Sequence, residues 1–180
     1  MELYFLRHGR SVSRADWAED DGQRPLTEDG RLDMAREVAT LARFGLRPDL
    51  IVTSPLRRAR QTAEIVAAGL EASDRLIDDD RLAQGFGPKR LRKVLRAHKE
   101  ARHIMLVGHE PDFSATIGKL TGGRVLCSKG GLARVDIADI EDRHGELVWL
   151  WQANQLVGEG VGQAVVVPAP PPPGELSQTT

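Results

Sequence analysis

The sequence has one cysteine, almost no net charge and no long apolar run. Cys127 is the single cysteine among 180 residues, which excludes an internal disulfide framework and suits a reducing compartment. Lys and Arg number 25 against 26 Asp and Glu, a net charge of −1, so charge gives no argument for nucleic-acid or membrane binding. No apolar stretch approaches a membrane span, and the N-terminus lacks the pattern of a signal peptide. We therefore expect a cytoplasmic protein that binds neither nucleic acid nor membrane.

Aromatic residues are also scarce, at 4% of the chain, so the core must consist mainly of Leu, Val, Ile and Ala. The length favours a single domain, which we place at residues 1–157. Beyond it lies the proline-rich run Pro168–Pro173, which predicts a disordered or polyproline II tail over residues 158–180. The alternative is that this tail is a ligand for a proline-reading domain.

Strand and helix signals alternate along the predicted domain. Alternation of this kind indicates an α/β fold, a three-layer sandwich with a mostly parallel central sheet and helices on both faces. The predicted helices cover 27–44, 56–68, 88–101 and a segment starting near Pro111, and the predicted strands cover 3–6, 50–53, 76–77 and 103–107, followed by a β-hairpin over 133–137 and 147–153.

The predicted helix over 27–44 has recognisable ends. Thr27 suits the N-cap position, and Gly45 suits the end of the helix. Apolar residues at helical spacing predict the face that packs against the sheet, namely Leu32, Ala35, Val38, Ala39 and Ala42.

The tripeptide Arg7-His8-Gly9 follows the first apolar run directly. It therefore lies at the carboxyl end of a predicted strand, where ligands bind in α/β sheets. Arginine binds phosphate oxygens with a planar fork, and neutral imidazole can act as a nucleophile near pH 7. Glycine permits a close approach of the backbone.

Three more segments carry complementary groups. Two follow predicted strands, so that Arg58 comes after the apolar run at 50–52 and His109 after the run at 104–107. The third is the turn Arg24-Pro25-Leu26-Thr27, which leads into the first helix. Together the four segments resemble the histidine phosphatase superfamily, also called the phosphoglycerate mutase-like family, over about residues 1–156. The short chain without a cap and the Arg-Pro-Leu-Thr turn look most like the SixA-type phosphohistidine phosphatases.

By this resemblance, His8 is the nucleophile and becomes a phosphohistidine. An imidazole beside two arginines has its protonated form disfavoured, which keeps a lone pair available for attack. Guanidinium groups supply the positive charge that Mg²⁺ supplies elsewhere, so we expect no metal and no cofactor. The groups expected around the phosphoryl group are Arg7, Arg58 and His109, and the predicted substrate-binding residues are Gly9, Ser11 and Arg24.

The general acid is less well defined. SixA-like members present an aspartate in the loop before the Arg-Pro-Leu-Thr turn, and Asp21 occupies that position, with Asp20 and Asp16 as alternatives. The segment 78–85 lacks a clear match to the glutamate of larger family members. An alkoxide leaving group needs a good proton donor, whereas imidazole leaves readily once protonated.

Each of these residues also has a simpler interpretation. His8 could be a hydrogen-bonded core histidine, although His109 and Arg58 at matching strand ends argue against this. A metal site shared by the two histidines lacks further ligands with suitable spacing. Arg24 could form an ion pair with the loop acids in place of a phosphate contact. Arg57 and Arg60 are expected to be surface charges.

These features favour hydrolysis of phosphohistidine on a protein, such as a phosphotransfer domain. An uncapped site can admit a phosphorylated side chain of a partner, whereas a small-molecule phosphatase more often encloses its ligand. One alternative is a small-molecule phosphomonoester or polyphosphate phosphatase of the same superfamily. Another is a non-catalytic phosphate-binding module, and a mutase is disfavoured.

The segment 88–102 carries an unusual excess of positive charge. An ordinary solvated helix face explains such a run. The functional alternative is docking of an acidic partner or a polyanionic substrate. The basic residues are Lys89, Arg90, Arg92, Lys93, Arg96, Lys99 and Arg102, against Glu100 alone.

Overall fold

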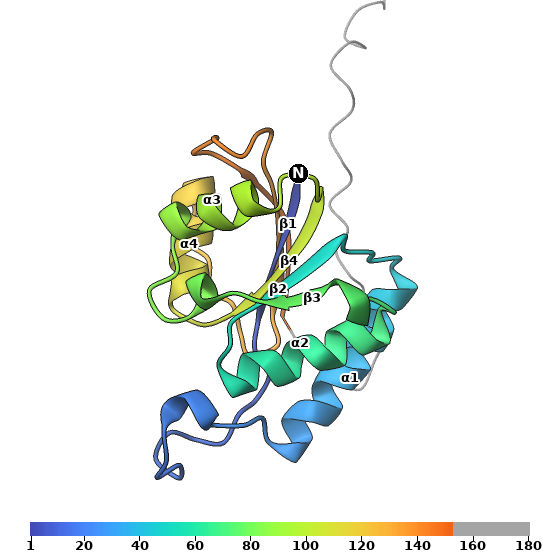
Figure 1. Ribbon diagram of the computed structural model, residues 1–180, viewed down its shortest axis with the longest axis vertical. Helices are drawn as coiled ribbons and strands as arrows, with labels where there is room; N and C mark the ends of the chain where they lie inside the picture. The colour runs from blue at the N-terminus through green and yellow to red at the C-terminus, as the bar shows by residue number, and fades with distance from the viewer. Residues whose placement is uncertain (153–180) are drawn as a thin grey trace, which may run out of the picture.

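A computed structural model describes residues 1–152 of the chain. Its centre is a six-stranded sheet with the order β3-β2-β4-β1-β5-β6 (Figure 1). The first four strands along the chain run parallel, and β5 runs antiparallel to both β1 and β6. The strands are β1 (Glu2–Arg7), β2 (Leu50–Thr53), β3 (Leu76–Asp78), β4 (His103–Gly108), β5 (Leu132–Asp136) and β6 (Glu146–Trp151).

Helices cover both faces of this sheet. Tyr4 and Leu6 of β1 pack on the side of α1 and α2, while Leu3 and Phe5 pack on the side of α3 and α4, because successive side chains of a strand point to opposite faces. Figure 1 shows the two pairs of helices on either side of the strands. The predicted three-layer α/β fold is confirmed. The helices are α1 (Glu28–Arg43), α2 (Arg57–Gly69), α3 (Pro88–Ala97) and α4 (Asp112–Thr121).

Helix α1 begins as the sequence predicts, but it packs with a different face. The hydroxyl of Thr27 caps the helix by accepting from the Gly30 N–H at 3.0 Å. The buried side chains include Met34, Val38 and Leu41, whereas Leu32 is 48% exposed. The predicted face was right at Val38 and wrong at Leu32, Ala35 and Ala39, which are exposed. It consisted largely of alanines, whose small side chains lose little when they stay in water. The larger Met34 and Leu41 decide which side turns inward.

Helix α3 is shorter than predicted. It ends at Ala97, and His98 is its C-cap. The chain then turns into β4. The Asp49 carboxylate holds the start of this strand by accepting from the N–H groups of Arg102, which precedes it, and His103, its first residue, at 2.8 and 2.9 Å. The predicted strands and the β-hairpin are confirmed to within a few residues.

The remaining elements are short 3-10 turns. These are η1 (Asp21–Gln23), η2 (Ser73–Arg75) and η3 (Asp80–Leu82). The segment between α2 and β4 holds only η2, β3, η3 and α3, so within residues 1–152 no subdomain covers the carboxyl ends of the strands. No helix in this part of the chain is long and apolar enough to cross a bilayer. The predicted tail at 158–180 and the domain boundary at 157 lie outside the described residues.

Candidate active site

The carboxyl ends of three neighbouring strands meet at one edge of the sheet. Arg7 at the end of β1 pairs in register with Gly108 at the end of β4, and the His8 N–H continues this ladder by donating to the Gly108 carbonyl at 3.0 Å. On the other side of β4, the Ser54 N–H donates to the Val107 carbonyl at 2.9 Å. The rings of His8 and His109 therefore lie close together, with centroids 5.3 Å apart.

His8 is buried and has one ring nitrogen fixed by the backbone. Its Nδ1 lies 2.8 Å from the Gly9 carbonyl oxygen. A carbonyl can only accept, so the neutral ring carries its proton on Nδ1 and keeps a lone pair on Nε2. Burial lowers the pKa of His8 well below its ordinary value, and His109, Arg58 and Arg7 lower it further. At neutral pH the Nε2 atom therefore keeps an available lone pair on an uncharged ring.

Gly9 is required by packing. A Cβ at this position would lie 2.7 Å from Met34 Cγ on α1, closer than carbon atoms can approach without a shift. The Gly9 N–H donates to Thr62 Oγ1 at 3.1 Å, and the Thr62 hydroxyl donates to the Arg58 carbonyl at 2.7 Å. Thr62 thereby joins the segment carrying His8 to the helix carrying Arg58.

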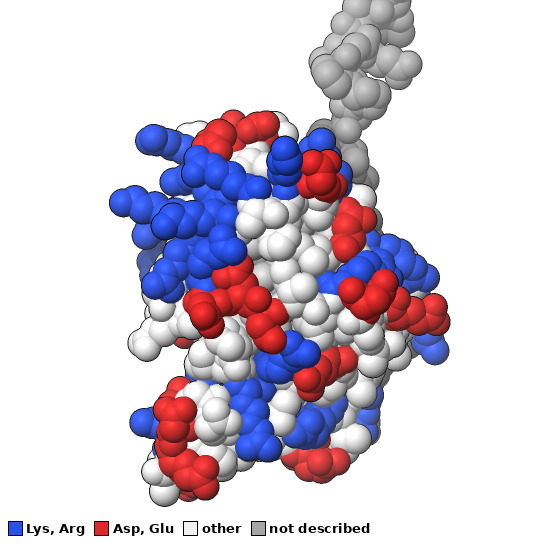
Figure 2. All heavy atoms as spheres, viewed as in Figure 1, with Lys and Arg blue, Asp and Glu red and all other residues white. Residues whose placement is uncertain are grey.

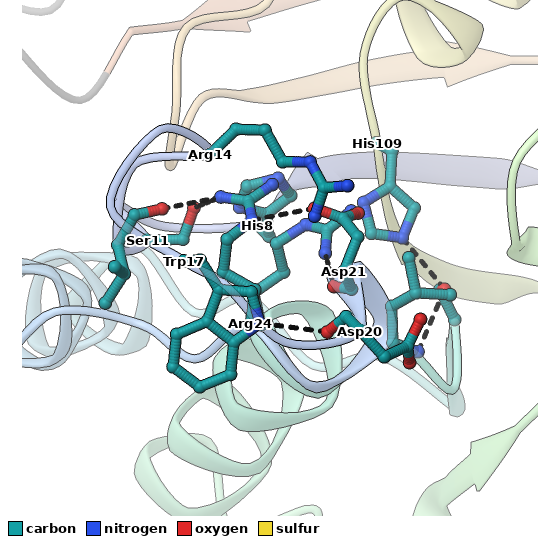
Figure 3. A network of polar contacts seen from close by, with 12 residues as sticks. His8, Ser11, Arg14, Trp17, Asp20, Asp21, Arg24 and His109 are labelled. Atoms are coloured by element: carbon teal, nitrogen blue, oxygen red, sulfur yellow. Dashed lines mark hydrogen bonds and ion pairs between the residues drawn. The ribbon is translucent and has the colours of Figure 1, made fainter.

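His109 is also buried, and its two ring nitrogens have different surroundings. Nε2 lies 2.8 Å from the Ser54 hydroxyl, while Nδ1 is buried and has no hydrogen-bond partner within residues 1–152. Burial, followed by the nearby Arg58 guanidinium, lowers the pKa of His109 to about 4. His109 is therefore neutral at physiological pH. Figure 3 shows its second ring nitrogen turned toward His8.

Arg7 and Arg58 place two guanidinium groups beside the histidines. Arg7 donates from Nη1 to the Cys127 carbonyl at 2.8 Å. The side chain of Arg58 is 8% exposed and pairs with Asp21. In each arginine the buried Nε has no hydrogen-bond partner in the described part of the chain. Buried N–H groups are rarely left unpaired, so these two groups are natural donors for an anionic ligand.

Asp21 joins three arginines at the edge of the site. Its carboxylate lies 2.8 Å from Arg24, 3.2 Å from Arg58 and 3.5 Å from Arg14 (Figure 3). The hydrogen bond from Arg24 and the positive charges of the other arginines lower the pKa of Asp21. A carboxylate held ionised in this way is an acceptor and not a proton donor at neutral pH, which argues against the predicted role of general acid.

The other two candidate acids lie farther out. Asp16 is exposed, and its carboxylate accepts from the Ser13 hydroxyl at 2.7 Å. Asp20 is exposed as well, and its backbone carbonyl accepts from the Trp17 indole at 2.9 Å. Neither carboxylate pairs with Arg7, Arg58 or a histidine of the site among the described residues. Of the three, the structure brings only Asp21 to the site.

Arg24 and Ser11, which we predicted to bind substrate, bind each other. Arg24 Nη1 donates to Ser11 Oγ at 2.8 Å and to the Val12 carbonyl at 2.6 Å, and its Nε donates to Asp21. The structure thus favours the ion-pair alternative for Arg24. Both residues hold the 11–21 segment to the turn that carries Arg24.

Three residues of the site were not predicted from the sequence. Ser54 contacts His109, Thr62 joins Gly9 to Arg58, and Arg14 reaches Asp21. Ser54 and Thr62 belong to the segment that carries Arg58, so their closeness to Arg58 in the sequence could have marked them as residues of the site. Arg14 lies in a polar loop where nothing distinguishes it from neighbouring charges. Arg57 is exposed and donates to the Gln23 carbonyl at 3.5 Å, and Arg60 is paired to Glu64 and Asp78.

Anion binding is the chemistry that this set of groups suits best. Two guanidinium groups and a second neutral imidazole lie beside a buried imidazole lone pair, an arrangement suited to bind and attack a phosphoryl group. No cluster of three His, Cys, Asp or Glu residues suited to a metal ion occurs in residues 1–152.

Comparisons with known proteins agree with this chemistry. The profile of the histidine phosphatase superfamily (branch 1) matches residues 3–88. An uncharacterized protein of Picosynechococcus sp. (strain ATCC 27264 / PCC 7002 / PR-6) is 42% identical over 119 residues, which are 63% of this chain and 68% of that protein.

Solved structures show the same fold. The protein histidine phosphatase SixA complexed with tungstate superposes with a TM-score of 0.77 and 21% identity, covering 87% of this chain and 99% of that chain. A mycobacterial glucosyl-3-phosphoglycerate phosphatase with bound VO3 superposes with a TM-score of 0.65 and 19% identity, covering 84% and 98%. The predicted family and fold are thus confirmed: the chain belongs to the histidine phosphatase superfamily, and it is a phosphatase whose fold matches that of SixA.

Proposed function

We propose that the protein hydrolyses phosphohistidine on a partner protein through a covalent phosphohistidine at His8. The observation that carries the nucleophile assignment is the hydrogen bond between His8 Nδ1 and the Gly9 carbonyl. It leaves Nε2 unprotonated in a ring whose pKa is lowered by burial and by nearby positive groups. A buried core histidine without a catalytic role has no need of two guanidinium groups beside it.

The reaction takes two steps. In the first, His8 Nε2 forms a bond to phosphorus and the bond from phosphorus to the substrate imidazole nitrogen breaks. The released imidazole nitrogen takes up a proton. In the second, a water oxygen attacks phosphorus, the bond to His8 breaks, and inorganic phosphate leaves while the ring returns to its neutral form. Arg7 and Arg58 stabilise the charge on the phosphoryl oxygens in both steps.

The choice of a P–N substrate is supported by the state of Asp21. Its pKa is lowered by Arg24 and its other arginine neighbours, so it is a poor proton donor for an alkoxide. A substrate imidazole, with an ordinary pKa near 6.5, takes a proton from water or buffer readily. The reaction that demands least from a general acid therefore fits this site best.

The choice of a protein substrate is supported by the open edge of the sheet. The side chains of Arg14 and Asp21 at this edge are 65% and 35% exposed, and no subdomain covers them within residues 1–152. A phosphorylated side chain on another domain can reach His8 in such a site without a closing lid.

The test is a panel that sets a phosphohistidine-bearing phosphotransfer domain beside common phosphomonoesters, with His8→Ala as the blank. We expect hydrolysis of the phosphohistidine protein at a kcat/KM well above that of any ester, and loss of this activity in the blank. Rapid release of phosphate from esters, with the phosphohistidine protein left intact, would overturn the proposed substrate. Failure to trap phosphate on His8 under conditions that preserve P–N bonds would overturn the proposed intermediate.

A small-molecule phosphatase is the second candidate. The structural match to glucosyl-3-phosphoglycerate phosphatase supports it, because that enzyme's name assigns it a small phosphorylated substrate on the same fold. The same panel separates the two candidates.

A further inference from the structure

The hydroxyl of Ser54 has one acceptor available for its proton. Ser54 is fully buried at the end of β2, and its Oγ accepts from the Leu56 N–H at 3.3 Å. The other polar atom within hydrogen-bond distance of Oγ, in the described part of the chain, is His109 Nε2 at 2.8 Å. A hydroxyl has one proton to donate, and a buried proton without an acceptor costs free energy.

The two neutral tautomers of His109 differ in what they leave unpaired. If Nε2 carried the proton, the Ser54 hydroxyl proton and the Nδ1 lone pair would both be buried without partners. If Nδ1 carries the proton, the Ser54 hydroxyl donates to Nε2 and only the Nδ1 N–H remains, turned toward His8 (Figure 3). The second arrangement satisfies more groups.

We propose that Ser54 is a positioning residue that holds His109 in the tautomer with its proton on Nδ1. The inference rests on the proposed function, because the Nδ1 N–H then donates to an oxygen of the phosphoryl group on His8. The opposite tautomer would place a lone pair against that anionic oxygen. Ser54 acts through His109 and does not itself contact the substrate.

The charges around His109 agree with a neutral donor. The groups that face it are Arg58, Arg7, Arg24, Asp21 and the ring of His8. Because three of these are cationic, a charged imidazolium is disfavoured. A hydrogen bond from Ser54 to the Nε2 lone pair also favours the neutral ring over the protonated one.

The direct test is ¹⁵N NMR of the imidazole nitrogens in the protein without substrate. We expect His109 to carry its proton on Nδ1 at pH 7, and Ser54→Ala to shift the population toward the proton on Nε2. Thr53→Val is the matched control, since it removes a buried hydroxyl from the same strand whose bond goes to the Ser54 carbonyl and not to His109. Wild-type protein with the proton on Nε2 would overturn the inference.

The kinetic test uses the phosphohistidine protein as substrate. Ser54→Ala is expected to lower kcat by about tenfold or more, with a smaller change in KM, as is typical when a group that orients a catalytic side chain is lost. The pKa of His109, followed by its NMR signals, should also rise, because the bond from Ser54 that favours the neutral ring is lost. An unshifted pKa of His109 with kcat equal to that of Thr53→Val would overturn the inference. Lack of phosphatase activity in the wild type would contradict the proposed function, while the NMR result would still decide the tautomer.

Discussion

The Arg58 guanidinium contacts Asp21 at two points, the backbone carbonyl and the side-chain carboxylate. Arg58 Nη1 donates to the Asp21 carbonyl at 2.8 Å, and Nη2 lies 3.2 Å from the Asp21 carboxylate. The contact joins the polar 11–21 loop to the first turn of α2, next to the two histidines. A guanidinium held from one side in this way presents its remaining buried N–H, on Nε, in a fixed direction.

Replacement of Asp21 by Asn is the first test of this contact. The loss of negative charge loosens Arg58, Arg24 and Arg14 together, so we predict that kcat/KM falls by about tenfold or more, in the range for lost positioning of an active-site group. Asp20→Asn is the matched control, because its carboxylate pairs with none of these arginines in the described residues.

The pH dependence separates positioning by Asp21 from proton donation. If Asp21 were the general acid, wild-type activity would fall as pH rises through its pKa, and Asp21→Asn would abolish that limb. We expect no such limb above pH 5, since the carboxylate is already ionised there.

The two buried histidines make the folded protein sensitive to acid. Their pKa values lie below the value of about 6.5 in an unfolded chain, and that of His109 is about 4. Between about pH 4 and pH 6.5 the unfolded chain binds more protons than the folded protein. The free energy of unfolding therefore falls as pH drops from 6.5 toward 4. Melting temperatures at pH 6.5 and 5 should therefore fall more steeply for wild type than for the double variant His8→Asn, His109→Asn. An equal fall in melting temperature for the two proteins would contradict the lowered pKa values of His8 and His109.

Glu37 acts on stability with the opposite sign. Burial on α1, and then the nearby Asp33, raise the pKa of its carboxyl to about 8. The folded state therefore binds the extra proton, and the stability from neutral Glu37 is lost as pH rises from about 4.5 through 8. We predict that Glu37→Gln resists urea better than wild type at pH 9 and about equally at pH 5. Glu100→Gln, whose side chain is 92% exposed, should match wild type at both.

Thr62 connects two parts of the site through buried hydrogen bonds. Thr62→Val keeps the side-chain shape but removes both the acceptor for the Gly9 N–H and the donor to the Arg58 carbonyl. Leaving a buried N–H unpaired costs about 1–3 kcal/mol. The free energy of unfolding should therefore fall by about this much, and the urea midpoint should fall with it. We also expect a lower kcat, because the His8 segment and α2 lose their direct connection. A stable variant with wild-type kcat would show that Thr62 does not position the site.

The parts of the site that sequence alone could predict are those tied to strand ends. His8, Arg58 and His109 each follow an apolar run, and parallel strands bring their carboxyl ends to one edge. The position of Ser54 at a strand end was predictable, but its contact with His109 was not, because that contact depends on β2 lying next to β4, an order that apolar runs do not encode. The environment of Asp21 depends on three arginines from different segments. The buried face of α1 was misjudged because alanines at helical spacing fit either side of a helix.

Helix α3 contains five basic residues and no acidic one. Figure 2 shows the basic side chains gathered over this helix, whose opposite side buries Leu91, Val94 and Leu95 in the core. Arg96 is paired with Glu141 at 2.7 and 2.6 Å. Lys93 is exposed and Arg92 partly so, and these two are the best candidates to meet an acidic partner.

Charge reversal at Arg92 and Lys93 tests whether this face docks the phosphorylated protein. If it does, Arg92→Glu with Lys93→Glu should raise KM for the phosphohistidine protein steeply at low salt and leave kcat nearly unchanged, since attraction between exposed charges is screened by salt. Hydrolysis of a small phosphorylated compound should not respond. The matched control is Arg36→Glu with Arg43→Glu on α1, which covers the opposite face of the sheet (Figure 1). An equal rise in KM for both variants would point to net charge alone, and no rise in either would identify α3 as an ordinary solvated helix face.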